Sequence, residues 1–123
     1  MAVTQSRDNR TFIAGIDLSA AQFKFVTLES DGQVDLANGA GENCIGVLLN
    51  NPTAASAATV AMTGKVMVKA GGTIAAGAAV ATDANGDAVA AATGNIIMGY
   101  ATEAGVDDQI IAIELIQGGN AAA

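Results

Sequence analysis

Residues 80–86, Val-Ala-Thr-Asp-Ala-Asn-Gly, decide how this chain folds. The dipeptide Asn85-Gly86 is the strongest short-range signal for a tight hairpin turn, and it follows a stretch suited to a β-strand. Residues 26–32, Val-Thr-Leu-Glu-Ser-Asp-Gly, have the same design, with a valine and then a turn glycine six positions later. We therefore expect two equivalent strands, each ending in a tight turn.

The similarity continues downstream of both turns. The spacing is 14 and then 14 positions from Gly32 to Gly46 to Val60, and 13 and then 14 positions from Gly86 to Gly99 to Ile113. Two units are too few for a solenoid array, so we interpret residues 26–62 and 80–115 as pseudo-repeats within one domain. A small β-barrel or sandwich with an internal pseudo-twofold repeat is the expected architecture.

The rest of the chain also favours short strands. Valine and isoleucine supply 20 residues, whose branched side chains suit a pleated sheet, and 15 glycines interrupt any long helix. Strands are predicted over residues 22–29, 44–49, 57–62, 65–69, 79–83, 96–102 and 109–116. One short helical turn is a candidate, opened by Ser19 with Gln22 completing a capping box.

The ends of the chain carry weaker patterns. Residues 1–11 are polar and aperiodic, and we interpret them as a flexible N-terminal arm. The single β domain then spans residues 12–116, and residues 117–123 form a C-terminal tail. No apolar stretch resembles a secretory signal or a membrane span, so we expect a protein kept in a soluble, reducing compartment.

Composition excludes several kinds of chemistry. The 123 residues include no histidine and one cysteine, so a Ser-His-Asp triad, a histidine-ligated zinc site and an internal disulfide are impossible. A net charge of −7 argues against nucleic-acid binding. All basic residues lie at or before Lys69, which indicates either a solvated acidic surface or a polarised molecule with a basic end facing a partner.

Short motifs also fail as catalytic or cofactor sites. Gly64-Lys65 lacks the earlier glycine and the following hydroxyl of a phosphate-binding loop, and the residues around Lys65 do not match biotin or lipoate carriers. The acids around Asn85-Gly86 do not complete a calcium loop. Cys44 lies in an apolar strand and is expected to be a buried, inert thiol. Asp107-Asp108 point to opposite faces of an extended chain. We expect no enzyme, no cofactor and no metal.

Four segments carry a family resemblance. They are residues 17–26 (DLSAAQFKFV), 41–48 (GENCIGVL), 70–77 (AGGTIAAG) and 92–104 (ATGNIIMGYATEA). In this order they resemble the bacteriophage and prophage capsid cement, or head decoration, proteins over residues 17–116. The resemblance implies a non-enzymatic, all-β virion protein, made in the host bacterial cytoplasm. It would bind the outer surface of the assembled head, commonly as a homotrimer, and tie neighbouring major capsid subunits together.

The residues before this match suggest how the protein contacts its partners. Arg7 and Arg10 lead into Phe12 and Ile13, so the arm is expected to order against the capsid or a neighbouring protomer. An Ala-rich core stabilises a monomer modestly, which independently favours association. Two alternatives remain open: a carrier or small-molecule-binding β-barrel, and a fibre or spike component of the head.

Overall fold

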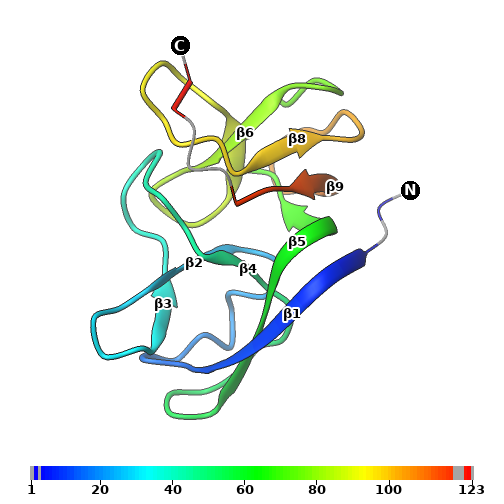
Figure 1. The fold of residues 1–123 in the computed structure, drawn as a ribbon. Coiled ribbons are helices and arrows are strands. Elements are labelled where there is room, and N and C mark those ends of the chain that lie inside the picture. Colours follow the sequence, from blue (N-terminus) through cyan, green and yellow to red (C-terminus); the bar gives the residue numbers. More distant parts are fainter. Residues whose placement is uncertain (1, 3, 118–120, 123) are drawn as a thin grey trace.

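The computed structural model describes residues 2, 4–117 and 121–122, apart from the side chains of Ser6 and Arg7. This part of the chain is all-β and contains no helix, which confirms the predicted fold class. The strands are β1 (Gln5–Ile13), β2 (Phe25–Leu28), β3 (Val34–Leu36), β4 (Gly46–Leu48), β5 (Ala57–Lys69), β6 (Ala79–Thr82), β7 (Ala88–Ala90), β8 (Gly99–Ala101) and β9 (Ile110–Leu115). They pair antiparallel in one curled sheet, as in a small β-barrel (Figure 1).

The sheet consists of two units with the same strand pairing. In the first unit β2 pairs with β3 and β4, and β4 pairs with β5. In the second unit β6 pairs with β7 and β8, and β8 pairs with β9. The long strand β5 runs through both halves of the molecule and joins the units by pairing with β9 (Figure 1). We call residues 5–62 the first unit and residues 63–115 the second unit.

The registers show that the repeat is structural. The cross-strand pairs Val26–Gly46, Leu48–Val60 and Val26–Leu36 correspond to Val80–Gly99, Ala101–Ile113 and Val80–Ala90. Residues that occupy the same register position in the two units are called counterparts below. The backbone path is repeated as well, because positive φ angles recur at counterparts: Phe23 and Gly77, Gly32 and Gly86, Gly41 and Gly94, Ala55 and Asp108.

Gly46 and Gly99 explain why the repeat keeps a glycine in β4 and β8. A Cβ on Gly46 would stand 2.1 Å from the carbonyl oxygen of Ala61, and one on Gly99 would stand 2.3 Å from that of Glu114. Ala61 and Glu114 are themselves counterparts, so both units contain the same close approach of two backbones. No other residue fits there without moving the strands apart.

The N-terminal residues correct the prediction of a flexible arm. Residues 5–13 form β1, which pairs with β5 from Ile13–Ala57 to Gln5–Lys65. Phe12 opposite Ala58 corresponds to Val68 opposite Ile111, so β1 is the counterpart of the C-terminal half of β5. The sequence pattern did not indicate this strand, because its outward face is polar and its large apolar residues, Phe12 and Ile13, occur only at its C-terminal end. The first unit therefore begins at β1.

Other boundaries also shift. The predicted strands 57–62 and 65–69 are one strand, β5, in which Gly64 has a φ of 103°. The predicted strand 22–29 shortens to β2. Strands β3 and β7 are the short strands expected after the two tight turns, whose bounds the sequence did not define. No helical turn forms at Ser19, whose N–H instead bonds to Asp17 Oδ1 in a local turn.

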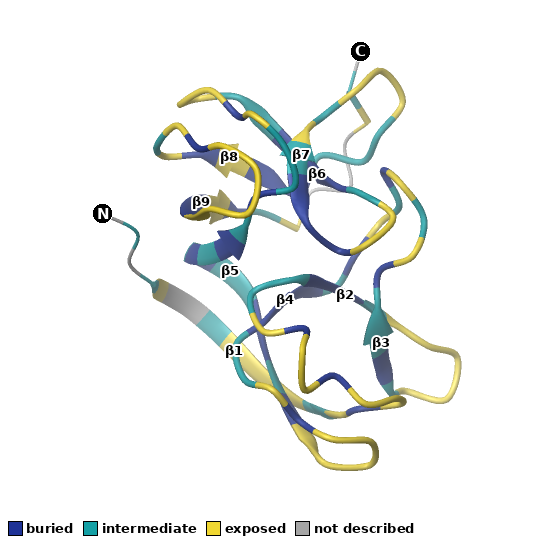
Figure 2. Ribbon diagram, turned by 180° about the vertical axis from the view of Figure 1, so that it is seen from behind, coloured by how far each residue is buried: buried dark blue, intermediate teal, exposed yellow. Residues whose placement is uncertain are grey.

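The hydrophobic core has two clusters. The first contains Ala14, Leu18, Ala21, Val26, Val34, Leu48, Ala58 and Val60. The second contains the counterparts of all of these except Ala21, namely Ala70, Ile74, Val80, Ala88, Ala101, Ile111 and Ile113. It also takes in Phe25, Ala37, Cys44, Val47 and Ala61 from the first unit. Strands β2 and β4 thus contribute residues to both clusters, and β4 is buried along its whole length (Figure 2).

The two units are packed head to tail. We call the row Phe25, Val47 and Ala61 the back face of the first unit, since it lies against the second unit and is fully buried. Its counterpart row, Ala79, Tyr100 and Glu114, is the back face of the second unit and is partly or largely exposed. A twofold axis would give both rows the same surroundings. The strand pairing of one unit therefore recurs in the other, while the two equivalent back faces have different surroundings.

Candidate interaction surfaces

The four predicted contact residues lie on β1, at an edge of the sheet (Figure 1). Arg10 is exposed, Phe12 packs partly against the first core cluster, and Ile13 is 43% exposed. The side chain of Arg7 lies outside the described residues. β1 therefore holds Phe12 inward and Ile13 outward, as the alternation of a strand requires.

Three of the basic residues that the structure describes lie beside carboxylates. Arg10 Nε lies 3.1 Å from Asp8 Oδ1, Lys69 Nζ lies 3.5 Å from Asp108 Oδ1, and Lys24 pairs with an acid of the second unit. Each of these positive charges is opposed by a carboxylate, which weakens any net attraction to an acidic partner. The structure thus gives no support to a polarised molecule with a basic end.

A clamp of polar groups joins the two units at the 83–87 turn. Lys24 Nζ lies 3.3 Å from Asp87 Oδ1 and donates to the carbonyl oxygen of Asn85 at 3.3 Å, while the N–H of Phe25 donates to Gly86 O at 2.8 Å. Burial raises the pKa of Asp87, and the positive charge of Lys24 opposes that rise. This ion pair spans more than sixty positions of sequence, so no local pattern could have predicted it.

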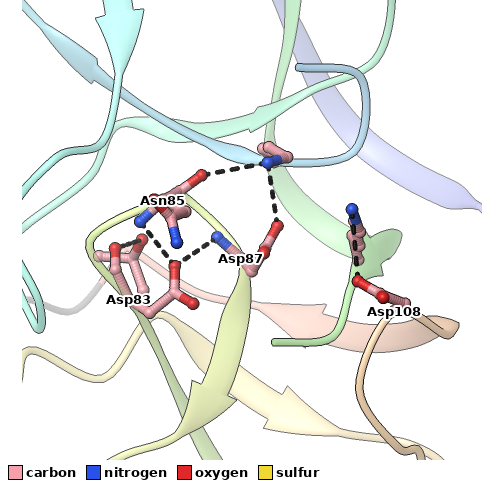
Figure 3. Close-up of polar contacts among 7 residues, drawn as sticks. Asp83, Asn85, Asp87 and Asp108 are labelled. Atoms are coloured by element: carbon pink, nitrogen blue, oxygen red, sulfur yellow. Dashed lines mark hydrogen bonds and ion pairs between the residues drawn. The ribbon is translucent and has the colours of Figure 1, made fainter. Parts of the chain in front are cut away.

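The same turn is not a cation site. Asp83 Oδ1 accepts the N–H groups of Asn85 and Asp87, at 2.8 and 2.9 Å (Figure 3). Both donors are backbone groups of the same turn, so this oxygen stabilises the turn. No group of three or more potential ligands able to hold a metal ion occurs among the described residues.

A small surface hollow of about 260 Å³ lies beside the joint of the two units. It is lined by Thr27, Leu28, Asn43, Cys44, Ile45 and Gln117. Gln117 Nε2 donates to the carbonyl oxygens of Ile45 and Met62 at 2.7 Å, so the start of the C-terminal tail is fixed to the fold. Cys44 is buried, as predicted, and its burial raises the pKa of the thiol to about 12.

Lys65 does not have the geometry of a carrier lysine. It lies in the interior of β5, opposite Gln5 on one side and Glu114 on the other, and is half-buried. A lysine that presents a prosthetic group to other active sites needs a protruding turn. Within the described chain, no helix is long and apolar enough to cross a membrane.

Several large apolar side chains are exposed on the outer surface. The exposed large apolar residues are Ile13, Ile16, Leu28, Tyr100, Val106 and Ile110. Sequence analysis singled out Ile13 but missed Leu28 and Tyr100, whose short strands suggested burial. An alignment of the two repeats could have singled out Leu28 and Tyr100, because their counterparts are Thr82 and Val47.

Comparison with known proteins agrees with this structure. The model of the phage cement protein family matches residues 4–115, which is nearly the whole described fold. The chain belongs to the phage cement protein family. This cement protein is therefore a structural protein of the phage head, and the match includes β1, which the sequence resemblance had left out.

A solved structure has the same fold. The crystal structure of the head fibre gp8.5 N base in bacteriophage phi29 superposes with a TM-score of 0.72 at 18% identity. The match covers 94% of the cement protein and 98% of that chain. A comparison with curated proteins found no significant match. Families of phage structural proteins are generally non-enzymatic.

Proposed function

We propose that this protein binds the outer surface of the assembled phage head and cements neighbouring major capsid subunits, as a homo-oligomer that we expect to be a trimer. The observation that carries the proposal is the match of the cement family model to residues 4–115. The fold supports it, because every stretch of the described sheet serves packing or an outer surface and none assembles a nucleophile, a base and an oxyanion site.

The contact surface is proposed to include β1. Its outer edge carries backbone groups that β5 does not use, and the exposed Arg10 and Ile13 flank that edge on opposite faces of the strand. An oligomer that presents several copies of such an edge would gain avidity on a lattice of equivalent sites. Arg7 remains part of this proposal through its place in β1.

The experiment is co-sedimentation with undecorated heads. Purified protein at micromolar concentration should pellet with heads to saturation and should raise the temperature at which the heads release DNA. Arg10→Glu combined with Ile13→Asp should reduce occupancy at least tenfold while leaving the unfolding temperature of the free protein nearly unchanged. Failure of the wild-type protein to co-sediment would overturn the proposal.

A second candidate is the base that attaches a fibre to the head. The similarity to the phi29 head fibre base, which covers 98% of that chain, favours it. The two candidates differ in their effect on heads: a cement raises shell stability in proportion to occupancy, whereas an attachment base binds without stabilising the shell. Heat stability of heads at saturating protein decides between them.

A further inference from the structure

We infer that this protein self-associates head to tail, by repeating between chains the contact that its two units make within one chain. The inference deepens the proposed homo-oligomer by naming its two surfaces, and it rests on the proposed function in that respect alone. The contact between the two units within one chain is the template for the contact between chains. The second unit presents the 83–87 turn, and the first unit presents its back face.

Each of the two surfaces in that contact has a counterpart in the described structure that is not covered by the other unit. The counterpart of the 83–87 turn is the 29–33 turn of the first unit, and the counterpart of the first back face is the second back face. A Cβ on Gly86 would meet the Leu36 side chain at 2.7 Å and Phe25 O at 3.1 Å, whereas no described atom lies within 4 Å of the equivalent point on Gly32. The first-unit turn is thus open where its counterpart is packed.

Two side chains at these open surfaces are larger than their buried counterparts. Leu28 is 50% exposed, although its counterpart Thr82 is fully buried. Tyr100 is 44% exposed, although its counterpart Val47 is fully buried. Leu28 in place of Thr82 and Tyr100 in place of Val47 are larger than solvent exposure requires. The other two positions of the second back face suit solvent, since Ala79 is smaller than Phe25 and Glu114 is more polar than Ala61. A second copy that covers both positions explains the pattern.

The charges on the two open surfaces are mixed, because Glu29 and Asp31 of the 29–33 turn and Glu114 of the second back face are all exposed acids. Ala61 and Val66 lie in the core, and their counterparts are Glu114 on the second back face and Arg10 on β1 of the first unit. Two apolar residues within the chain are thus replaced by charges of opposite sign, although Arg10 is already paired with Asp8. The intrachain ion pair Lys24–Asp87 is not copied, because its counterparts are Ala78 and Gln33.

One part of the second back face is already covered. The N–H of Gly41 donates to Thr82 O at 2.8 Å, but the N–H of its counterpart Gly94 donates to Ala122 O at 2.9 Å. The end of the chain therefore takes the place of a neighbour at Gly94. The second copy docks beside it, with its 29–33 turn on Ala79 and Tyr100. Surfaces that differ in this way form rings when the rotation closes.

The test uses one variant on each surface. Gly32→Asn adds a side chain at a positive φ that asparagine tolerates, in a place that is open in the single chain but blocked in the docked one. Tyr100→Lys places a charge on the second back face. Val106→Lys is the matched control, because Val106 is 58% exposed and its counterpart Thr53 is exposed too.

Sedimentation velocity from 1 to 100 μM gives the readout, with circular dichroism verifying that each variant is folded. Wild type and Val106→Lys should associate equally, and each surface variant should associate at least tenfold more weakly. Mixed in equal amounts, Gly32→Asn and Tyr100→Lys should form a 1:1 pair, because one intact contact remains. A monomeric wild type, unaffected surface variants or a mixture that fails to pair would each overturn the inference. Monomeric protein that still co-sediments with heads would overturn it and leave head binding intact.

Discussion

Gly46 and Gly99 offer the sharpest test of the repeat. An alanine at either position places a Cβ 2.1 or 2.3 Å from a carbonyl oxygen of the neighbouring strand, where ordinary contact begins at 3.4 Å. The strands must separate by about 1 Å. The obstacle is backbone and not the end of a flexible side chain, so no rotamer change relieves it.

The cost can be worked from the structure. β4 pairs with β5 through two register pairs, Val47–Ala61 and Leu48–Val60, so separating them weakens most of that short contact. Loss of one or two hydrogen bonds costs about 1 kcal/mol each, and overpacking costs about 1–3 kcal/mol. We therefore expect Gly46→Ala to lower the free energy of unfolding by about 3–4 kcal/mol, a large share of the roughly 5–15 kcal/mol of a typical domain.

Urea unfolding followed by circular dichroism measures this loss. Gly99→Ala should cost about the same, because the repeat reproduces the close approach. Gly72→Ala is the matched control, since no described atom lies within 4 Å of its Cβ position and its φ is not positive, and it should change stability by less than about 1 kcal/mol. If Gly46→Ala and Gly72→Ala unfold at the same urea concentration, the reasoning about close strand approach is wrong.

Three further outcomes follow from the same structure. Lys24→Met should destabilise the fold by about 3 kcal/mol at neutral pH, because it strands the largely buried carboxylate of Asp87. Since the folded pKa of Asp87 is already raised, this penalty should shrink as the pH falls through that pKa and the carboxyl group becomes neutral; a penalty constant between pH 7 and pH 3 in urea titrations would contradict the assignment. Cys44 should resist iodoacetamide at pH 8 and react fully in urea, as measured by intact mass; rapid labelling of the folded protein would refute a buried thiol. Deleting residues 2–11 should leave the edge of β5 unpaired and cause aggregation visible by light scattering, whereas a soluble, fully folded product would show that β1 is dispensable.

Local chemistry explains why much of the fold was predictable. The Asn85-Gly86 turn, the alternating apolar residues of β5 and β9 and the recurring glycines follow rules that act over a few residues, and all occur where they were expected. Strands such as β3 and β7 have three residues each, too few to show a period. β1 escaped because its stability comes from its partner β5 and not from its own apolar content.

The sequence by itself determined an all-β domain with two similar halves, since strand propensity and turn chemistry are properties of short segments. Only the tertiary structure decided how the two copies meet. The same pattern buries Val47 and exposes Tyr100, and it opposes Lys24 to an acid that lies far away in the chain. Burial depends on what packs against a face, and two units packed head to tail give their equivalent faces different neighbours. That asymmetry leaves one copy of each contact surface open to a partner.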